Sequence, residues 1–555
     1  MNDASAGGAV AMTGTGGVTG MAGARGTGGV QGAGGSAAMP PPSIQITDAG
    51  VAPDAADADA DAGGAADASA DAGAIEAAVP CDVTGSPATE ACLVDDRYSV
   101  FVVKGAVGTG TKATPTGSIS AALAVARQSG LSHVIVCNDT YTETVALDAM
   151  QGKVAIDGGF ACPMTSGSSD AGAGWHYAPG QRTVIAPLSG PALTINGAVG
   201  AVTLSDLELR SAAGVPGGSS IAAVVTGSVS VTLRRDVITA GAGGVGAAGI
   251  AGVAGIDGLD ASLTEPPYDP ICSNPPATLP GGRWTTSTAC GSLGGKGGDA
   301  FLNGAGEAGQ SGSPQQNLVS TILLNGGAAG TNTKQPGKPG NKGSAGTDGD
   351  PGVAASASGA LSATGYTSAD GNAGSDGHTG QGGGGGGGSL STATCVAGSG
   401  GVGGMGGCGG THGTGGHGGG ASIAMIVWDS GVTLVDTSLH SSNGGAAGNG
   451  GDAGSGGLGK IGTAPPDSVT QAVPRGGPGG KGGDGGNAGS GSGGSGGPSY
   501  ALVFHGTKPV ELGMTTLTSS PGGAAGHGGA VGTARLAPAP DGAIGVSAAR
   551  FQVTP

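Results

Sequence analysis

The stretch Ser422-Ile-Ala-Met-Ile-Val-Trp-Asp-Ser-Gly-Val-Thr-Leu-Val-Asp-Thr-Ser-Leu-His-Ser-Ser-Asn-Gly-Gly-Ala-Ala-Gly448 joins an apolar, β-branched run to the start of a glycine tract. The same order of features recurs in residues 499–526 and 220–244, and a weaker copy occupies residues 318–330. Such apolar runs predict strands. One copy cannot bury its own apolar face, so the recurrence predicts an all-β solenoid in which copies stack as coils. A glycine excursion would leave each coil at a fixed point.

Short apolar anchors set the spacing of these coils. Four tripeptides share one pattern, and each is followed five residues after its leucine by a second anchor: Val202-Thr-Leu204 by Leu209, Val231-Thr-Leu233 by Ile238, Val432-Thr-Leu434 by Leu439, and Val510-Glu-Leu512 by Leu517. The step from Leu204 to Leu233 suits a solenoid repeat of roughly twenty to thirty residues. The chain is therefore long enough for about seven or eight coils.

The glycine tracts keep a period of three. Glycine occupies every third position in residues 243–258, 337–352, 371–386, 398–419, 445–457 and 477–489. A polyproline-II-type helix has three residues per turn, so this period places glycine along one edge. Glycine there allows neighbouring helices to approach closely and to pair their backbone groups. We expect polyglycine- or polyproline-II-type helices packed on one flank of the solenoid; the alternative is a set of disordered loops.

Composition excludes several classes of function. Glycine supplies 128 of 555 residues and aromatic residues only 3%, so much of the chain cannot build an ordinary side-chain core. The net charge is −17 without a basic patch, so we expect no nucleic-acid partner. No run of about twenty apolar residues is present, so we expect no transmembrane segment.

The eight cysteines form an even set without a C-x-x-C pair, which favours disulfides and an oxidising compartment. They lie in couples that are near in sequence: Cys81 and Cys92, Cys137 and Cys162, Cys272 and Cys290, Cys395 and Cys408. Neighbour pairing is the simplest hypothesis, although spacing cannot fix connectivity. Buried free thiols are the alternative. We expect an extracellular or cell-surface location, although no export signal is visible after Met1.

Composition divides the chain into four segments. Residues 1–80 are rich in Gly, Ala and Asp, and we expect a disordered tether because they have little to bury. Residues 81–240 are expected to form an N-terminal β-helix, and residues 241–420 glycine-rich excursions with one weak coil near 316–325. Residues 421–555 are expected to form C-terminal coils with further excursions.

Residues 81–156 contain the expected start of the solenoid. Apolar patterns predict strands at residues 98–103, 133–136, 140–147 and 153–156. Ser118 is an N-cap residue for a helix over residues 119–128, and Gly130 ends it. The helix would cover the first coil.

These residues resemble the N-terminal part of pectin-lyase-like right-handed parallel β-helix proteins. The resemblance rests on Phe101-Val-Val, Gly110-Thr-Lys-Ala-Thr-Pro115, Ile119 with Ala121-Ala-Leu123, Val134-Ile-Val, and Asp139-Thr-Tyr-Thr-Glu143. It covers residues 95–240, with Asp139 where the family usually has glycine. It extends to the later coils only because they repeat the same sequence pattern. It implies the fold and the plugging role of the helix, and it does not imply lyase activity. The tract Gly476-Gly-Pro-Gly-Gly-Lys-Gly-Gly-Asp-Gly-Gly486 resembles PGRS-type glycine-rich surface proteins in composition.

Two motifs are metal-site candidates. Gly294-Gly-Lys-Gly-Gly-Asp-Ala-Phe-Leu302 fits one copy of a calcium-binding nonapeptide, with Asp299 as the ligand. Such sites need tandem copies, so a chance match is the competing interpretation and no cofactor is assigned. Cys395, Cys408, His412 and His417 are zinc ligands by type, but their spacing matches no standard finger. We expect these histidines to decorate a glycine helix.

Acidic residues near the coil edges are the candidates for catalysis. Asp206 and Asp236 lie near Arg210, Arg234 and Arg235, the residue types that β-helix lyases use with calcium. Asp429 and Asp436 are the candidates for a pair of carboxylates facing across a groove. The acids of adjacent coils do not line up in the sequence, so no catalytic residue is assigned.

We expect a non-catalytic secreted or cell-surface protein with a structural or adhesive role. Its β-helix and glycine-helix surface would bind a polysaccharide or a cell-surface or matrix component. The first alternative is a β-helix carbohydrate-active enzyme, either a polysaccharide lyase or a glycoside hydrolase. The second is an ice- or crystal-surface-binding protein, because flat glycine-helix faces suit ordered lattices.

Overall fold

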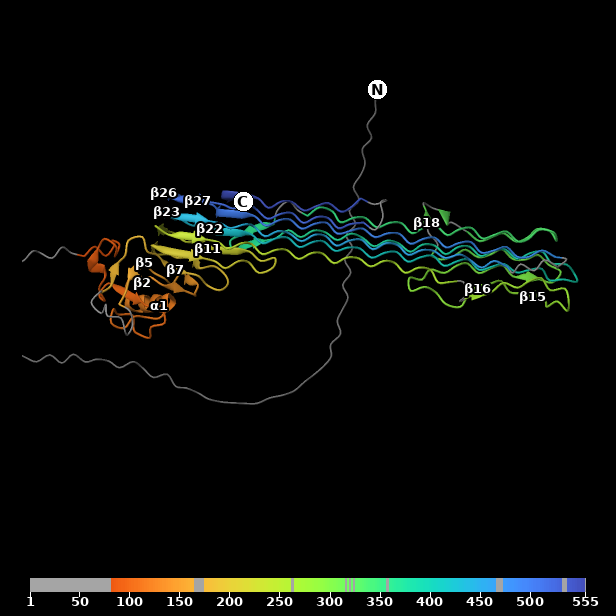
Figure 1. Cartoon of the computed structure of the whole chain (residues 1–555), viewed down its shortest axis with the longest axis horizontal. Coiled ribbons are helices and arrows are strands. Elements are labelled where there is room, and N and C mark those ends of the chain that lie inside the picture. The colour runs from red at the N-terminus through yellow and green to blue at the C-terminus, as the bar shows by residue number, and fades with distance from the viewer. Residues whose placement is uncertain are drawn as a thin grey trace, which may run out of the picture. The chain divides into compact units, whose positions relative to one another are not determined.

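A computed structural model describes residues 81–163, 174–260, 264–314, 317–318, 321–322, 325–355, 359–465, 473–531 and 537–554 (Figure 1). The expected disordered tether at residues 1–80 lies outside the described residues. The expected all-β class is confirmed, because strands in parallel sheets dominate the regular structure.

Three parallel sheets are stacked from successive turns of the chain. Sheet A has the order β1 (Ser99–Val102), β2 (His133–Cys137), β5 (Val154–Ala161), β9 (Val202–Ser205), β12 (Val231–Arg234), β23 (Val432–Val435) and β26 (Val510–Leu512), with β6 (His176–Tyr177) antiparallel to β5. Sheet B holds β3 (Thr140–Tyr141), β7 (Thr183–Ile185), β10 (Leu207–Arg210), β13 (Val237–Thr239), β24 (Ser438–His440) and β27 (Thr516–Thr518). Sheet C holds β4 (Val145–Leu147), β8 (Leu193–Asn196), β11 (Ser220–Thr226), β22 (Ser422–Trp428), β25 (Ser499–His505) and β28 (Ser547–Val553). Each turn passes from sheet A to B to C, which is the order of a solenoid.

The repeated phrases of the sequence meet as neighbouring strands. In sheet C, Ser220 lies opposite Ser422, and Ser422 lies opposite Ser499. In sheet A, Leu204 lies opposite Leu233, and Leu233 lies opposite Leu434. All three leucines are fully buried in one core cluster. The predicted coil step is therefore confirmed.

The last coil departs from the expected register. Glu511, not Leu512, lies opposite Leu434, because three residues separate β26 from β27 while two separate β23 from β24. A one-residue slip turns each side chain to the other face of a strand. Val510 and Leu512 are about half exposed as a result. The strand expected over residues 140–147 also differs, because the chain turns there from sheet B (β3) to sheet C (β4).

A helix covers the first coil, as predicted. α1 (Ile119–Ser129) begins where the Ser118 hydroxyl accepts the Ala121 N–H at 3.1 Å, and Gly130 ends it with a φ of 71°. The buried face of α1 joins the core of the sheets through Ile119 and Leu123. The short 3-10 helix η1 (Ala91–Leu93) precedes β1.

Glycine segments leave the solenoid after sheet B and return before sheet C (Figure 1). We call these segments the glycine bundle; they comprise residues 241–258, 294–298, 306–312, 326–330, 337–352, 371–388, 398–420, 443–463, 476–497, 521–531 and 539–545. Their backbone hydrogen bonds advance in steps of three. Gly243, Gly246 and Gly249 donate to the carbonyls of Asn443, Ala446 and Asn449, and the series continues to Gly258.

The three-residue step is enforced by close approach of backbones. A Cβ atom added at Gly413 would lie 2.0 Å from the carbonyl oxygen of Gly451, and one added at Gly346 would lie 1.9 Å from that of His378. No side chain fits at such distances. The segments therefore pack against one another, which argues against the alternative of disordered loops for these residues.

Among the described residues, four short antiparallel strand pairs lie outside the three sheets. They are β14 (Thr264–Glu265) with β16 (Arg283–Trp284), β15 (Thr278–Leu279) with β17 (Ala300–Phe301), β18 (Asn317–Leu318) with β19 (Thr321–Ile322), and β20 (Ala360–Ser362) with β21 (Gly365–Thr367). Of the weak coil expected near 316–325, the described residues include β18 and β19, which pair with each other; residues 315–316, 319–320 and 323–324 lie outside the described residues, so this coil stays a prediction. Leu361 and Tyr366 of the last pair pack on the outer face of sheet C. Among the described residues, no helix could span a membrane.

Candidate functional site

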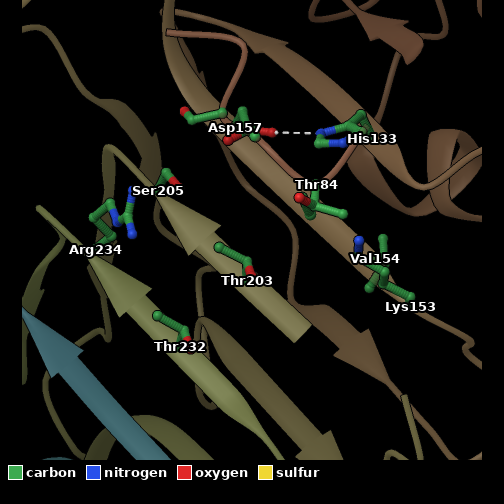
Figure 2. Close-up of a pocket in the computed structure, with 12 residues that line it drawn as sticks. Thr84, His133, Lys153, Val154, Asp157, Thr203, Ser205, Thr232 and Arg234 are labelled. Atoms are coloured by element: carbon green, nitrogen blue, oxygen red, sulfur yellow. Dashed lines mark hydrogen bonds and ion pairs between the residues drawn. The ribbon is translucent and has the colours of Figure 1, made fainter. Parts of the chain in front are cut away.

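A cavity of about 210 Å³ lies on the outer face of sheet A (Figure 2). Side chains alternate between the two faces of a strand, so every second residue of β2, β5, β9 and β12 points outward. The register lines up His133, Ala155, Thr203 and Thr232 in one row. Asp157, Ser205 and Arg234 form the next row. The small side chain of Ala155 leaves the hollow between larger neighbours.

The N-terminal loop closes one side of this cavity. Thr84, Gly85 and Ser86 line it, and the disulfide between Cys81 and Cys92 ties the loop back onto the chain. Tight packing shapes the loop, because a Cβ atom at Gly85 would lie 2.5 Å from the Glu90 side chain.

A buried ion pair forms the floor of the cavity. His133 Nδ1 lies 3.3 Å from Asp157 Oδ2, and both side chains are about 95% buried. His133 Nε2 lies 3.2 Å from the carbonyl oxygen of Val83, so this pair also fastens the loop. Burial opposes the charge of His133, but the hydrogen bond to Asp157 raises its pKa above the usual value. Burial raises the pKa of Asp157, against the hydrogen bonds from His133 and Ser205.

This arrangement differs from a nucleophilic triad. Ser205 lies by the carboxyl group of Asp157 and not by the imidazole, whose two nitrogens already face Asp157 and Val83. A serine nucleophile needs a base within hydrogen-bond reach of its hydroxyl. The floor of the cavity therefore positions the loop and offers no activated nucleophile.

The acids near the first coils are engaged in holding turns together. Asp206 adopts a positive φ of 56° at the corner between β9 and β10. Its carboxylate accepts from Arg235 of the next coil at 2.9 Å. Asp236 is fully buried and accepts the N–H groups of Leu207 at 2.8 Å and Arg234 at 3.1 Å. Burial raises the pKa of Asp236 to about 8.

The other acidic candidates are placed at different corners of the coil. Asp429 lies between β22 and β23 and its carboxylate is 2.8 Å from His505 Nδ1. Asp436 lies between β23 and β24 and accepts the N–H of Met514 at 2.8 Å. Each therefore binds the following coil at its own corner. Arg210 pairs with Glu208 of its own strand.

The cysteines predicted as disulfide partners are all bonded, but half of the pairing was wrong. Cys81–Cys92 and Cys137–Cys162 are confirmed, whereas Cys272 pairs with Cys395 and Cys290 with Cys408. Ile271 donates to the Val396 carbonyl at 2.9 Å, which places Cys272 beside Cys395. Segments far apart in sequence meet in the glycine bundle, and spacing alone cannot reveal this.

The metal-site candidates have other partners. His412 pairs with Asp376 at 2.7 Å and His417 with Asp370 at 3.1 Å, while both candidate cysteines are in disulfides. Asp299 pairs with Lys296 at 2.8 Å and accepts the Gly281 N–H at 2.7 Å. In the part of the chain that the structure describes, no three or more His, Cys, Asp or Glu side chains gather as a metal site.

The cavity residues were missed in the sequence. The strands that carry His133 and Lys153 were predicted, but their register against Thr203 and Thr232 was not extended back from the later coils. Combining the coil step with the period of two would have placed His133, Thr203 and Thr232 in one outward row. The covering loop has no such signal.

Comparison of the chain with protein-family models, with curated proteins and with solved structures finds no match. The site must therefore be interpreted from its own geometry.

Proposed function

We propose that this chain is a non-catalytic structural or adhesive protein of the cell exterior. The main support for this proposal is that the acidic residues considered for catalysis are engaged in contacts between coils. Asp206, Asp236 and Asp429 each hold one coil to the next, and the described contacts leave no pair of them facing across a groove. Glycoside hydrolysis requires two carboxyl groups flanking one bond.

The architecture supports a structural role. Three parallel sheets capped by α1 suit a right-handed β-helix like that of the pectin-lyase-like proteins. The three-residue hydrogen-bond step suits polyglycine-II-type helices. The glycine segments that begin at residues 241, 443 and 521 each follow a strand of sheet B (β13, β24 and β27), so the bundle is extended as coils are added and presents one continuous flank.

The location and the partner follow from chemistry. Four disulfides among the described residues favour an oxidising compartment outside the cytosol. A polysaccharide or a matrix component is the proposed partner, because the outer face of sheet A offers a row of hydroxyl groups, from Thr203, Thr232 and Thr433, at regular strand spacing.

A polysaccharide panel, with and without calcium, tests this function. We expect co-sedimentation of the protein with at least one insoluble polysaccharide and no release of reducing or unsaturated ends. Depolymerisation that disappears in Asp206→Asn or Asp236→Asn, but persists in the matched surface variant Asp541→Asn, would instead support a β-helix lyase or hydrolase. Absence of binding to every member of the panel would count against the adhesive role.

A further inference from the structure

The cavity on sheet A carries two cations without a carboxylate partner. Lys153 precedes β5 and Arg234 ends β12, and both line the cavity with exposed side chains. Neither is in an ion pair with a described residue, whereas Arg210, Arg235 and Arg550 each pair with a carboxylate. The whole chain has a net charge of −17, so this local surplus of positive charge stands out.

The charge on the cavity floor does not cancel these cations. Asp157 is 4% exposed and its carboxyl group faces His133 in the floor of the cavity, away from Lys153 and Arg234 in the described ion pairs. Asp82 also interacts with Lys153: hydrogen bonds from Thr84 lower the pKa of Asp82, and the charge of Lys153 lowers it further. Asp82 is solvent-exposed, so it competes weakly for Lys153 across water.

Hydroxyl groups complete the set of donors. Thr203 and Thr232 lie side by side between the two cations, and no hydrogen bond to a described residue occupies either hydroxyl (Figure 2). Ser86 accepts from the Ala88 N–H at 3.3 Å, which leaves its own proton free to donate. Thr84 differs, because it already donates to Asp82 at 2.7 Å.

We propose that this cavity binds a tetrahedral oxyanion, a phosphate or sulfate group. Lysine, arginine and three separate hydroxyls supply single donors from several directions, and the oxygens of a tetrahedral anion can accept them together. A planar carboxylate has only two oxygens for the same donors. The volume of about 210 Å³ admits the anion and a small part of its carrier. The site shares Thr203 and Thr232 with the face of sheet A proposed above for the partner, but anion binding by the cavity does not require that polysaccharide binds.

Titration calorimetry of the full chain tests the ligand class. The probes are inorganic phosphate, inorganic sulfate, glucose 6-phosphate, acetate and glucose. We expect phosphate or sulfate to bind at least about tenfold more tightly than acetate, with glucose silent. Equal affinity for free phosphate and glucose 6-phosphate assigns the site to the anion alone, and tighter binding of the ester assigns it to a phosphorylated sugar. Equal binding of acetate, or no binding of either tetrahedral anion, would overturn the proposal.

Matched variants locate the site. Arg234→Gln and Lys153→Gln should each weaken phosphate binding about tenfold, whereas Arg127→Gln on α1 should leave it unchanged. Thr203→Val should weaken binding, while Thr433→Val, the same change two strands further along the row, should not. Unchanged thermal unfolding would show that each variant folds. Equal losses in the cavity variants and in their controls would contradict the assignment.

Discussion

In the stacked sheets Leu204, Leu233 and Leu434 meet with no exposed surface, whereas in the glycine bundle Gly413 meets the backbone of Gly451 directly. In both regions, backbone hydrogen bonds join neighbouring chain segments. The sheets gain apolar burial from large side chains, but the bundle gains close backbone contact from their absence. The two regions should therefore respond in opposite ways to the same kind of substitution.

The largest effect should come from the long-range disulfides. Replacing Cys290 and Cys408 together by serine opens a loop with a sequence separation of 118 residues. The Cys272–Cys395 disulfide that remains shortens the effective loop, so chain-entropy reasoning predicts a loss of about 3 to 4 kcal/mol in the free energy of unfolding. Removing Cys81 and Cys92, separated by 11 residues, should cost less, about 2 to 3 kcal/mol. Calorimetric unfolding measures the loss of stability in both double variants. An equal loss, or a larger loss without Cys81–Cys92, would be evidence against stabilisation of the bundle by its long-range disulfides.

Truncation of a core side chain should come next. Leu204→Ala leaves a cavity in the core and should lower the free energy of unfolding by about 2 to 5 kcal/mol. Ile250→Ala is the matched change in the bundle, where the Ile250 side chain is 75% exposed. It should change stability by less than about 0.5 kcal/mol. Denaturant titration measures both, and a large effect of Ile250→Ala would mean that side chains hold the bundle together.

Replacing glycine by alanine should have the opposite pattern, with the larger loss of stability in the glycine bundle. Gly413→Ala places a Cβ atom 2.0 Å from a carbonyl oxygen and should cost about 1 to 3 kcal/mol by forcing the segments apart. Gly152→Ala is the control, because nothing lies within 4 Å of its added Cβ atom. Thermal unfolding should separate the two variants. Equal stability of both would refute close packing around Gly413.

The buried carboxyl group of Asp236, which lies in the stacked sheets, should make the stability of the fold depend on pH. Its folded pKa of about 8 is above the unfolded value, so the folded state holds this proton more tightly. The contribution of Asp236 to stability is therefore full below about pH 4 and declines up to about pH 8, by at most about 1.4 kcal/mol per pH unit. Asp236→Asn removes this decline. Because asparagine resembles the protonated carboxyl group and does not titrate, the melting temperatures of the two proteins should be most alike near pH 5 and should diverge towards pH 8.5 as the wild type loses stability; parallel curves would exclude the titration.

The sequence predicts the sheets better than the site. The coil step from Leu204 to Leu233 and the cap at Ser118 follow from apolar spacing and from local hydrogen-bond chemistry. The partners of Cys272 and Cys290 do not, because the bundle brings together segments more than a hundred residues apart. The glycine period predicts close packing without saying which segments meet. The cavity could not be predicted for a similar reason: it depends on a loop around Thr84 that covers strands later in the chain.

Amide hydrogen exchange with residue resolution tests the central claim most directly, namely that regularly spaced backbone hydrogen bonds hold the glycine bundle. In residues 407–420, two of every three amides donate to backbone carbonyls, whereas in residues 246–258 only every third amide does. We predict exchange as slow as in β22 at two of every three amides in residues 407–420 and at every third amide in residues 246–258. Exchange of both segments at the rate of an unstructured chain would contradict the account.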